Sequence, residues 1–193
     1  MKIVCLLGSP REKGNSAVIA NRFCDTAEGL GAEVKTFTLN NRQYRGCQAC
    51  MACKTKLDRC ALKDDLAEVL EAVRETDVLV LASPVYFGDV SAQLKTFMDR
   101  TFSYLVPDFM TNPRKSRLAP GKKLVLILAQ NNPDQRNFAD IYPKLQFFTQ
   151  AYGGFGESHL IRAVGVNEPG EVVSHEDVMK LAETTAEKIC NGA

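Results

Sequence analysis

Four of the chain's seven cysteines lie in one stretch of fifteen residues, GCQACMACKTKLDRC at 46–60. The pattern is C-x2-C-x2-C-x6-C, formed by Cys47, Cys50, Cys53 and Cys60. Cysteines at such spacing can form a disulfide, bind zinc, hold an iron–sulfur cluster or act as a thiol redox pair. The spacing by itself leaves all four chemistries open.

The surrounding residues favour some of these chemistries over others. The first apolar run ends at Gly-Ser-Pro without an export signal, so we expect a cytoplasmic protein with reduced thiols. Zinc commonly uses two separated C-x2-C pairs, and the first C-x2-C here lacks a thioredoxin context. Two consecutive two-residue steps suit thiolates around one iron–sulfur centre. Basic residues surround the stretch, and they could offset the negative charge of such a centre: Arg45, Lys54, Lys56, Arg59 and Lys63.

The elements that must position these cysteines follow from hydrophobic patterning. Continuous apolar runs predict strands at 2–7, 77–83 and 123–129, an alternating pattern predicts one at 33–39, and 158–166 is expected to form a fifth. Amphipathic stretches predict helices at 15–31, 64–76, 91–105, 136–153 and 174–192. Asp64 or Asp65 is expected to cap the second helix, and Ser174 is expected to cap the last helix. Pro143 either kinks the fourth helix or marks a late start of that helix. Alternating buried strands and helices predict a doubly wound parallel sheet with ligands at the carboxyl ends of the strands.

Length and composition predict one domain over residues 1–193, with a cysteine-rich insertion at 45–61. The chain is 45% hydrophobic and 24% charged, which is ordinary for a globular protein. Its formal net charge is +1, and there is no basic stripe and no apolar run of membrane-spanning length. We therefore expect neither nucleic acid nor a membrane as a partner.

The loop after the first strand, GSPREKGNS at 8–16, has the parts of an anion site. It matches neither the G-x-G-x-x-G fingerprint nor the P-loop. The parts are hydroxyls, an amide, a guanidinium and a glycine before a helix N-terminus: Ser9, Arg11, Gly14, Asn15 and Ser16. The alternative is an ordinary loop in which Asn15 or Ser16 caps the helix.

This loop resembles the G-S-x-R-x-x-G-N-S phosphate loop of the NADPH-dependent FMN reductase family. The stretch SPVYFGDVSAQLKTFMDR at 83–100 resembles a second signature of that family, and the two motifs lie in the right order within residues 1–130. The resemblance implies a flavodoxin-like fold with five parallel strands in the order 2-1-3-4-5, and FMN as cofactor.

The second loop has features that suit a flavin ring. It follows the third strand, at the expected ligand edge. Pro84 and Gly88 shape a turn whose backbone N–H groups, Val85 included, can face the ring, and Tyr86 and Phe87 offer flat surfaces. Asp99 and Arg100 are expected to form a structural or subunit-contact pair. The third loop, AQNNPD at 129–134, departs from the Thr- and Gly-rich family pattern, although its Gln130 and Asn131 could still reach a flavin edge.

The cysteine pattern resembles that of iron–sulfur flavoproteins, a branch of the same superfamily with a 4Fe-4S cluster beside FMN. The segment follows the second strand, so the resemblance predicts a cluster at the same sheet edge as the phosphate loop. Other members of the superfamily keep cysteines here without a cluster, so zinc and idle thiols stay open.

These features predict an FMN-binding oxidoreductase in which the flavin does the chemistry and no side chain acts as acid or base. One alternative is an NAD(P)H-dependent reductase of flavin or quinone without metal, and another is a non-catalytic electron carrier or redox sensor. Expected partners are a nicotinamide or ferredoxin-type donor or acceptor. The long loop at 106–122 is expected to support a homodimer or homotetramer.

Overall fold

Five parallel strands form the central layer of the computed structural model, which describes residues 1–192. They are β1 (Lys2–Leu7), β2 (Glu33–Thr38), β3 (Val78–Tyr86), β5 (Lys122–Ala129) and β6 (Phe155–Ala163). The sheet order is β2-β1-β3-β5-β6. Counted among parallel strands alone, this is the order 2-1-3-4-5, so the predicted doubly wound, flavodoxin-like fold is confirmed.

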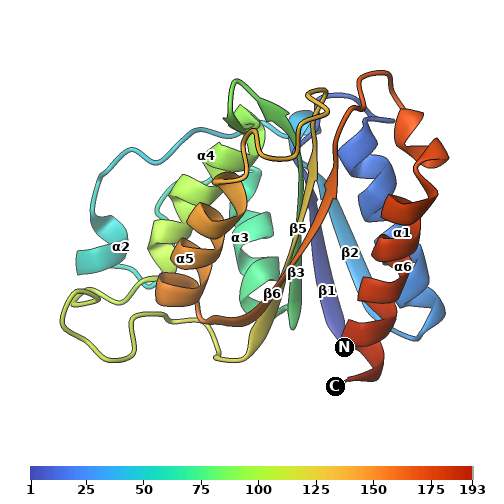
Figure 1. Cartoon of the computed structure of the whole chain (residues 1–193). Helices are drawn as coiled ribbons and strands as arrows, with labels where there is room; N and C mark the ends of the chain where they lie inside the picture. The colour runs from blue at the N-terminus through green and yellow to red at the C-terminus, as the bar shows by residue number, and fades with distance from the viewer. Residues whose placement is uncertain (193) are drawn as a thin grey trace.

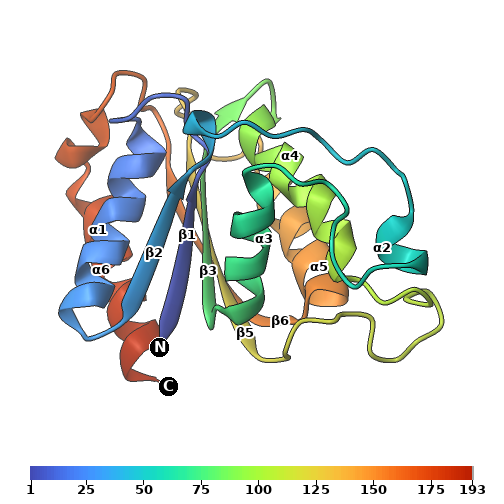
Figure 2. The same ribbon diagram turned by 180° about the vertical axis from the view of Figure 1, so that it is seen from behind.

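Helices cover both faces of the sheet (Figure 1). Their bounds are α1 (Asn15–Gly29), α2 (Ala52–Thr55), α3 (Leu66–Glu75), α4 (Ala92–Arg100), α5 (Ile141–Gly153) and α6 (Glu176–Asn191). Helices α1 and α6 pack on one face and α3, α4 and α5 on the other, as the reverse view in Figure 2 also shows. No helix in residues 1–192 has the length and apolar content that a membrane crossing needs.

The three central strands, β1, β3 and β5, carry long apolar runs because each contributes side chains to two cores. In β1, Cys5 faces the core under α1 and α6, whereas Leu6 faces the core under α3, α4 and α5. Val80 and Leu81 of β3 divide in the same way. Alternate side chains of a strand point to opposite faces of the sheet. Because helices cover both faces, these strands do not alternate between apolar and polar residues as a half-exposed strand does.

A short antiparallel strand, β4 (Asp89–Val90), was not predicted. It pairs with the end of β3 through Val85–Val90 and Tyr86–Asp89, so β3 runs past Ser83 to Tyr86. Phe87 and Gly88 form the two-residue turn, with φ of 49° and 83°. Positive φ at both central residues is the geometry that closes a two-residue hairpin.

Several helix ends differ from the prediction. Helix α5 begins at Ile141, so Pro143 lies in its first turn and marks a late start rather than a kink. Ser174 does not cap α6, because its hydroxyl donates to the Glu171 carbonyl within the 3-10 turn η3 (Glu171–Ser174). At α3, an Asp64 oxygen accepts from the Leu66 N–H at 3.2 Å, a cap-like contact two residues before the helix.

Ser91 joins the first loop to α4. Its Oγ donates to the Gly8 carbonyl at 2.7 Å and accepts from the Leu94 N–H at 3.3 Å, and the residue is fully buried. Ser91 is therefore both the N-cap of α4 and a clamp between the ends of β1 and β3.

We predict that Ser91→Ala lowers the free energy of unfolding by about 1 to 2 kcal/mol, because it removes a cap and leaves the Gly8 carbonyl unpaired. Urea denaturation followed by circular dichroism measures the change. Ser174→Ala is the control, since this exposed serine caps nothing and should shift stability by less than about 0.5 kcal/mol. Equal losses in the two variants would contradict the assignment of Ser91 as a clamp.

Candidate functional site

The loop at 8–16 is a tight backbone turn at the carboxyl end of β1. The buried Ser9 Oγ donates to the Arg11 carbonyl and accepts from the Arg11 N–H, each at 3.1 Å. The Gly14 N–H returns to the Arg11 carbonyl at 3.0 Å. A Cβ on Gly14 would lie 2.4 Å from Ser9 Oγ, so this turn accepts only glycine at that position.

The N-terminus of α1 opens onto this loop without a side-chain cap. Its N-cap residue is Gly14, and no side chain bonds to the first-turn N–H groups. The alternative in which Asn15 or Ser16 caps the helix is therefore wrong. Ser16 Oγ is buried and has no hydrogen-bond partner among the described residues. Free N–H groups and an unpaired hydroxyl at a helix N-terminus suit an anion.

Two of the residues predicted to bind the ligand also make contacts within the protein. The Asn15 amide donates to the Glu168 carbonyl at 3.0 Å and accepts from the Val172 N–H at 3.1 Å. The Arg11 guanidinium donates to the Asn167 carbonyl at 2.8 Å while remaining exposed. Both side chains hold the loop against the segment after β6, a contact that the sequence offered no signal to predict.

The second loop lies beside the first. The Gly8 N–H donates to the Ala82 carbonyl at 2.8 Å, which joins the ends of β1 and β3. Beyond this point Pro84 and Val85 are half-buried, whereas Tyr86 and Phe87 are 44% and 111% exposed. Phe87 thus combines complete exposure with a left-handed backbone that bulky residues avoid, and strain of this kind persists mainly at functional sites.

Gln130 of the third loop also supports the scaffold. Its amide nitrogen donates to the Asn132 carbonyl at 2.8 Å, and its oxygen accepts from Arg162 Nε at 3.0 Å. The side chain is buried, whereas Asn131 is exposed at the loop surface. Of the two residues considered for a flavin edge, only Asn131 has its side chain free for such a contact.

The cysteine segment does not lie where it was predicted. From the end of β2 the chain crosses the tops of α3 and α4 and descends to α2, on the far side of α4 and α5 (Figures 1 and 2). Its contacts include Arg100 at the carboxyl end of α4, whereas the flavin-loop candidates precede the amino end of that helix. Nine helical residues at 1.5 Å each separate the two ends by about 13 Å.

The four cysteines line one shared pocket at this place. Cys47 and Cys50 are exposed, Cys53 and Cys60 are half-buried, and all four thiols are free. The residue before Cys50 and the residue after it are left-handed, with φ of 50° at Ala49 and 56° at Met51, which bends the chain around the pocket. Within residues 1–192, no three His, Cys, Asp or Glu side chains are already gathered around a single metal position.

A buried lysine points at one of these sulfurs. Lys54 Nζ donates to the carbonyls of Phe102 and Leu105 at 2.6 and 2.9 Å, and it lies 3.7 Å from Cys53 Sγ. Burial lowers the pKa of Lys54, and the neighbouring Cys53 opposes that shift. No carboxylate of the described residues lies within ion-pair distance of it. A buried cation without a carboxylate suits an anionic partner in the pocket.

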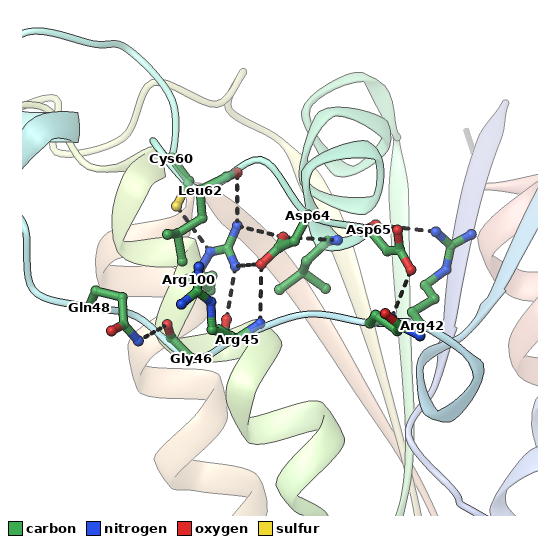
Figure 3. Close-up of polar contacts among 11 residues, drawn as sticks. Arg42, Arg45, Gly46, Gln48, Cys60, Leu62, Asp64, Asp65 and Arg100 are labelled. Carbon is green, nitrogen blue, oxygen red and sulfur yellow. Dashed lines mark hydrogen bonds and ion pairs between the residues drawn. The ribbon is translucent and has the colours of Figure 1, made fainter.

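Arg100 contacts a second sulfur from the last residue of α4 (Figure 3). Its Nε donates to Cys60 Sγ at 3.0 Å, and its two terminal nitrogens bind Asp64 at 2.9 and 3.1 Å. Burial lowers the pKa of Arg100, but the bonds to Asp64 and Cys60 outweigh it and the net shift is upward. Asp99 pairs with Lys95 instead, so the expected pairing of Asp99 with Arg100 is wrong.

Comparisons with known proteins identify relatives of this chain. Over 101 residues the chain is 38% identical to an iron–sulfur flavoprotein of Methanocaldococcus jannaschii, an alignment covering 52% of each protein. The chain thus spans about half the length of this relative. Over 191 residues it is 24% identical to a Bacillus subtilis protein named as an NAD(P)H-dependent FMN-containing oxidoreductase, with 94% of each chain covered.

Solved structures support the same fold. An NAD(P)H:quinone oxidoreductase from Methanothermobacter marburgensis superposes with a TM-score of 0.74 at 17% identity, covering 98% of this chain and 96% of the other. Residues 1–132 match the NADPH-dependent FMN reductase family, a stretch that includes both loops and all four pocket cysteines. With two thirds of its length matched, this chain belongs to the NADPH-dependent FMN reductase family.

Proposed function

We propose that this protein is an FMN-dependent oxidoreductase whose four clustered cysteines bind an iron–sulfur cluster. When bound, FMN supplies hydride and electron chemistry and the cluster supplies one-electron transfer. The observation that carries the proposal is the cysteine pocket, where four thiols share one cavity and two buried cations are directed at its sulfurs. The chain then forms a single flavin-binding domain with the cysteine segment inserted after β2.

The first loop suits the phosphate of FMN. The uncapped start of α1 offers backbone N–H groups and a positive dipole end, and the unpaired Ser16 hydroxyl can donate to a phosphate oxygen. Ser9 shapes the loop, and Gly14 lets its backbone approach the ligand. Arg11 has N–H groups besides the one bound to Asn167, so its guanidinium can still add a charged contact.

The second loop suits the ring of FMN. Tyr86 and Phe87 present exposed aromatic surfaces, and the strained turn at Phe87 and Gly88 holds them away from the core. Pro84 and Val85 set the backbone between this turn and the buried part of β3. We propose that these groups orient and cover the ring, while no side chain serves as acid or base.

The charges around the cysteine pocket fit a cluster better than neutral thiols. An iron–sulfur centre held by four thiolates is anionic, and the buried Lys54 and Arg100 provide cations beside Cys53 and Cys60. A pair of neutral thiols would leave Lys54 without a counter-charge. Unliganded thiols therefore rank below a metal centre, and the two consecutive two-residue steps between the first three cysteines favour an iron–sulfur cluster over zinc. All seven cysteines are free, which suits a reducing compartment such as the cytosol.

The electron partners follow from the two sites. A nicotinamide, as NAD(P)H, would reach the exposed aromatic loop, in keeping with the family. Exposed basic residues lie near the cysteines in the sequence and would attract an acidic, ferredoxin-type protein: Arg45, Lys56, Arg59 and Lys63. An iron-free NAD(P)H reductase is the second candidate, because the thiols are not already gathered around a metal position. A carrier or sensor without turnover is the third.

The loop at 106–122, which is expected to join subunits, borders a large apolar cavity of about 780 Å³ between α4 and α5. Phe109 and Phe148 line the cavity, and Met110 and Phe147 are exposed beside it. Apolar surface of this extent indicates an interface. We propose that a second copy covers it in a homodimer or homotetramer.

Sedimentation velocity at micromolar concentration is expected to give a dimer or larger. Phe148→Glu, which adds charge at the cavity rim, should shift the species toward monomer, whereas Lys180→Glu on the distant α6 should not. A native protein that sediments only as a monomer would contradict the interface.

We predict that Gly14→Ala weakens FMN binding by at least about tenfold, because its Cβ would collide with Ser9 Oγ and displace the phosphate loop. Fluorescence titration of the apoprotein with FMN measures the change. Gly29→Ala is the control: no atom lies within 4 Å of its Cβ position, so binding should be unchanged and stability equal or higher by up to about 1 kcal/mol. Unaltered affinity in Gly14→Ala would argue against this loop as the phosphate site.

The experiment that tests the function is anaerobic purification followed by flavin, iron and sulfide analysis, then rapid mixing with NADPH. We expect one FMN, about four irons and about four sulfides per chain, and rapid bleaching of the flavin absorbance. Cys53→Ser should lose the iron and keep the FMN, whereas Cys190→Ser, remote from the pocket, should keep both.

Each failure of this experiment has a distinct meaning. FMN without iron, even under anaerobic conditions, would remove the cluster and leave the iron-free reductase. Iron and FMN without bleaching by NADPH would favour the carrier. No FMN at all would reject the proposed function.

A further inference from the structure

We propose that Arg100 is a positioning residue that raises the reduction potential of the iron–sulfur centre, through a hydrogen bond from its Nε–H to Cys60 Sγ. This inference rests on the proposed function, and it concerns a residue that the cysteine pattern does not include. The contact joins a helix to a cysteine forty residues earlier in the chain, at an N–S distance of 3.0 Å.

All five N–H groups of the guanidinium have an acceptor (Figure 3). Asp64 accepts from both terminal nitrogens, at 2.9 and 3.1 Å. The carbonyls of Arg45 and Leu62 accept the second hydrogens of those nitrogens, at 2.9 and 3.5 Å. The side chain is fully buried. Rotation of the guanidinium would break several of these bonds together, so the Nε–H is fixed in its direction toward Cys60.

The bond to sulfur is not needed to hold the segment in place. In the sequence, Arg45 precedes the four cysteines, and Leu62 and Asp64 follow them. The terminal nitrogens of Arg100 bind the carbonyls of Arg45 and Leu62 and the Asp64 carboxylate, so they already join both ends of the segment to α4. A neutral thiol is a weak acceptor, whereas a thiolate bound to iron accepts a charged N–H strongly. The Nε–H contact therefore acts on the charge of the sulfur.

Hydrogen bonds and positive charge at a cluster's sulfurs favour its reduced form, because reduction adds negative charge to the centre. Lys54 contributes charge at Cys53, but its bonds to two carbonyls at 2.6 and 2.9 Å are much shorter than its 3.7 Å approach to sulfur. Arg100 is thus the main donor to a cluster ligand among the described residues.

The test compares two substitutions that keep the charge. Arg100→Lys retains a cation and loses the Nε–H donor to sulfur. Arg117→Lys is the matched control, since Arg117 donates to the carbonyls of Ser103 and Cys53 and to no sulfur. In anaerobic redox titrations, Arg100→Lys should lower the midpoint potential of the cluster by at least about 59 mV. For one electron this is a tenfold change in the reduction equilibrium constant. Arg117→Lys should shift it by less than half of that.

A second measurement starts from the native protein, so its first result does not depend on the folding of a variant. Native protein labelled with ¹⁵N-arginine and reduced should show, by pulsed electron paramagnetic resonance, a hyperfine coupling between the cluster spin and one arginine nitrogen. That coupling should be absent in Arg100→Lys and present in Arg117→Lys.

The outcomes separate this inference from the proposed function. Iron analysis comes first, and a chain without iron overturns the centre and the role of Arg100 together. A chain with iron but no arginine coupling, or with equal midpoints in native protein and Arg100→Lys, overturns the role of Arg100 alone.

Discussion

The buried ion pair between Arg100 and Asp64 determines where the cysteine segment lies. Arg100 is fully buried and Asp64 is partly exposed, so loss of Asp64 would leave a buried cation without its carboxylate, a change that costs about 3 to 5 kcal/mol in buried pairs. The two residues are thirty-six positions apart and bonded at 2.9 Å. Because the pair joins the chain after the cysteines to the carboxyl end of α4, the four thiols form one pocket instead of an extended loop.

The two loops proposed to bind FMN depend on a different constraint, the meeting of parallel strands at one sheet edge. The Gly8 N–H binds the Ala82 carbonyl, and Ser91 bonds back to Gly8. These contacts place an uncapped helix start next to a strained aromatic turn. An anion-binding backbone and a flat apolar surface side by side are what a flavin nucleotide requires.

Helix α4 therefore separates the two sites while it positions both. Ser91 anchors its amino end to the flavin loops, and Arg100 anchors its carboxyl end to the cysteine pocket. The two ends of the helix itself are roughly 13 Å apart. Any electron exchange between the two sites thus depends on the structure around this helix, including the apolar cavity between α4 and α5.

Much of this protein follows from local sequence. The apolar runs such as 2–7 and 123–129 predicted the strands, since strands covered on both faces carry apolar side chains at every position. GSPREKGNS and SPVYFGDVSAQLKTFMDR pointed to the family, and the cysteine spacing to a shared site. Helix ends were less predictable, as at Ser174, because a capping serine and a turn serine look alike in sequence.

The tertiary structure decided what depends on contacts far apart in the chain. The end of β2 determines only where the cysteine segment starts, and the cysteines themselves lie by the carboxyl end of α4. Long-range bonds from Arg100, Lys54 and Arg117 carry the segment to the other end of α4. Asn15 and Gln130 likewise bind partners more than thirty residues away. Spacing identifies which residues can do chemistry, but burial and ion pairing, which sequence does not display, determine where they meet.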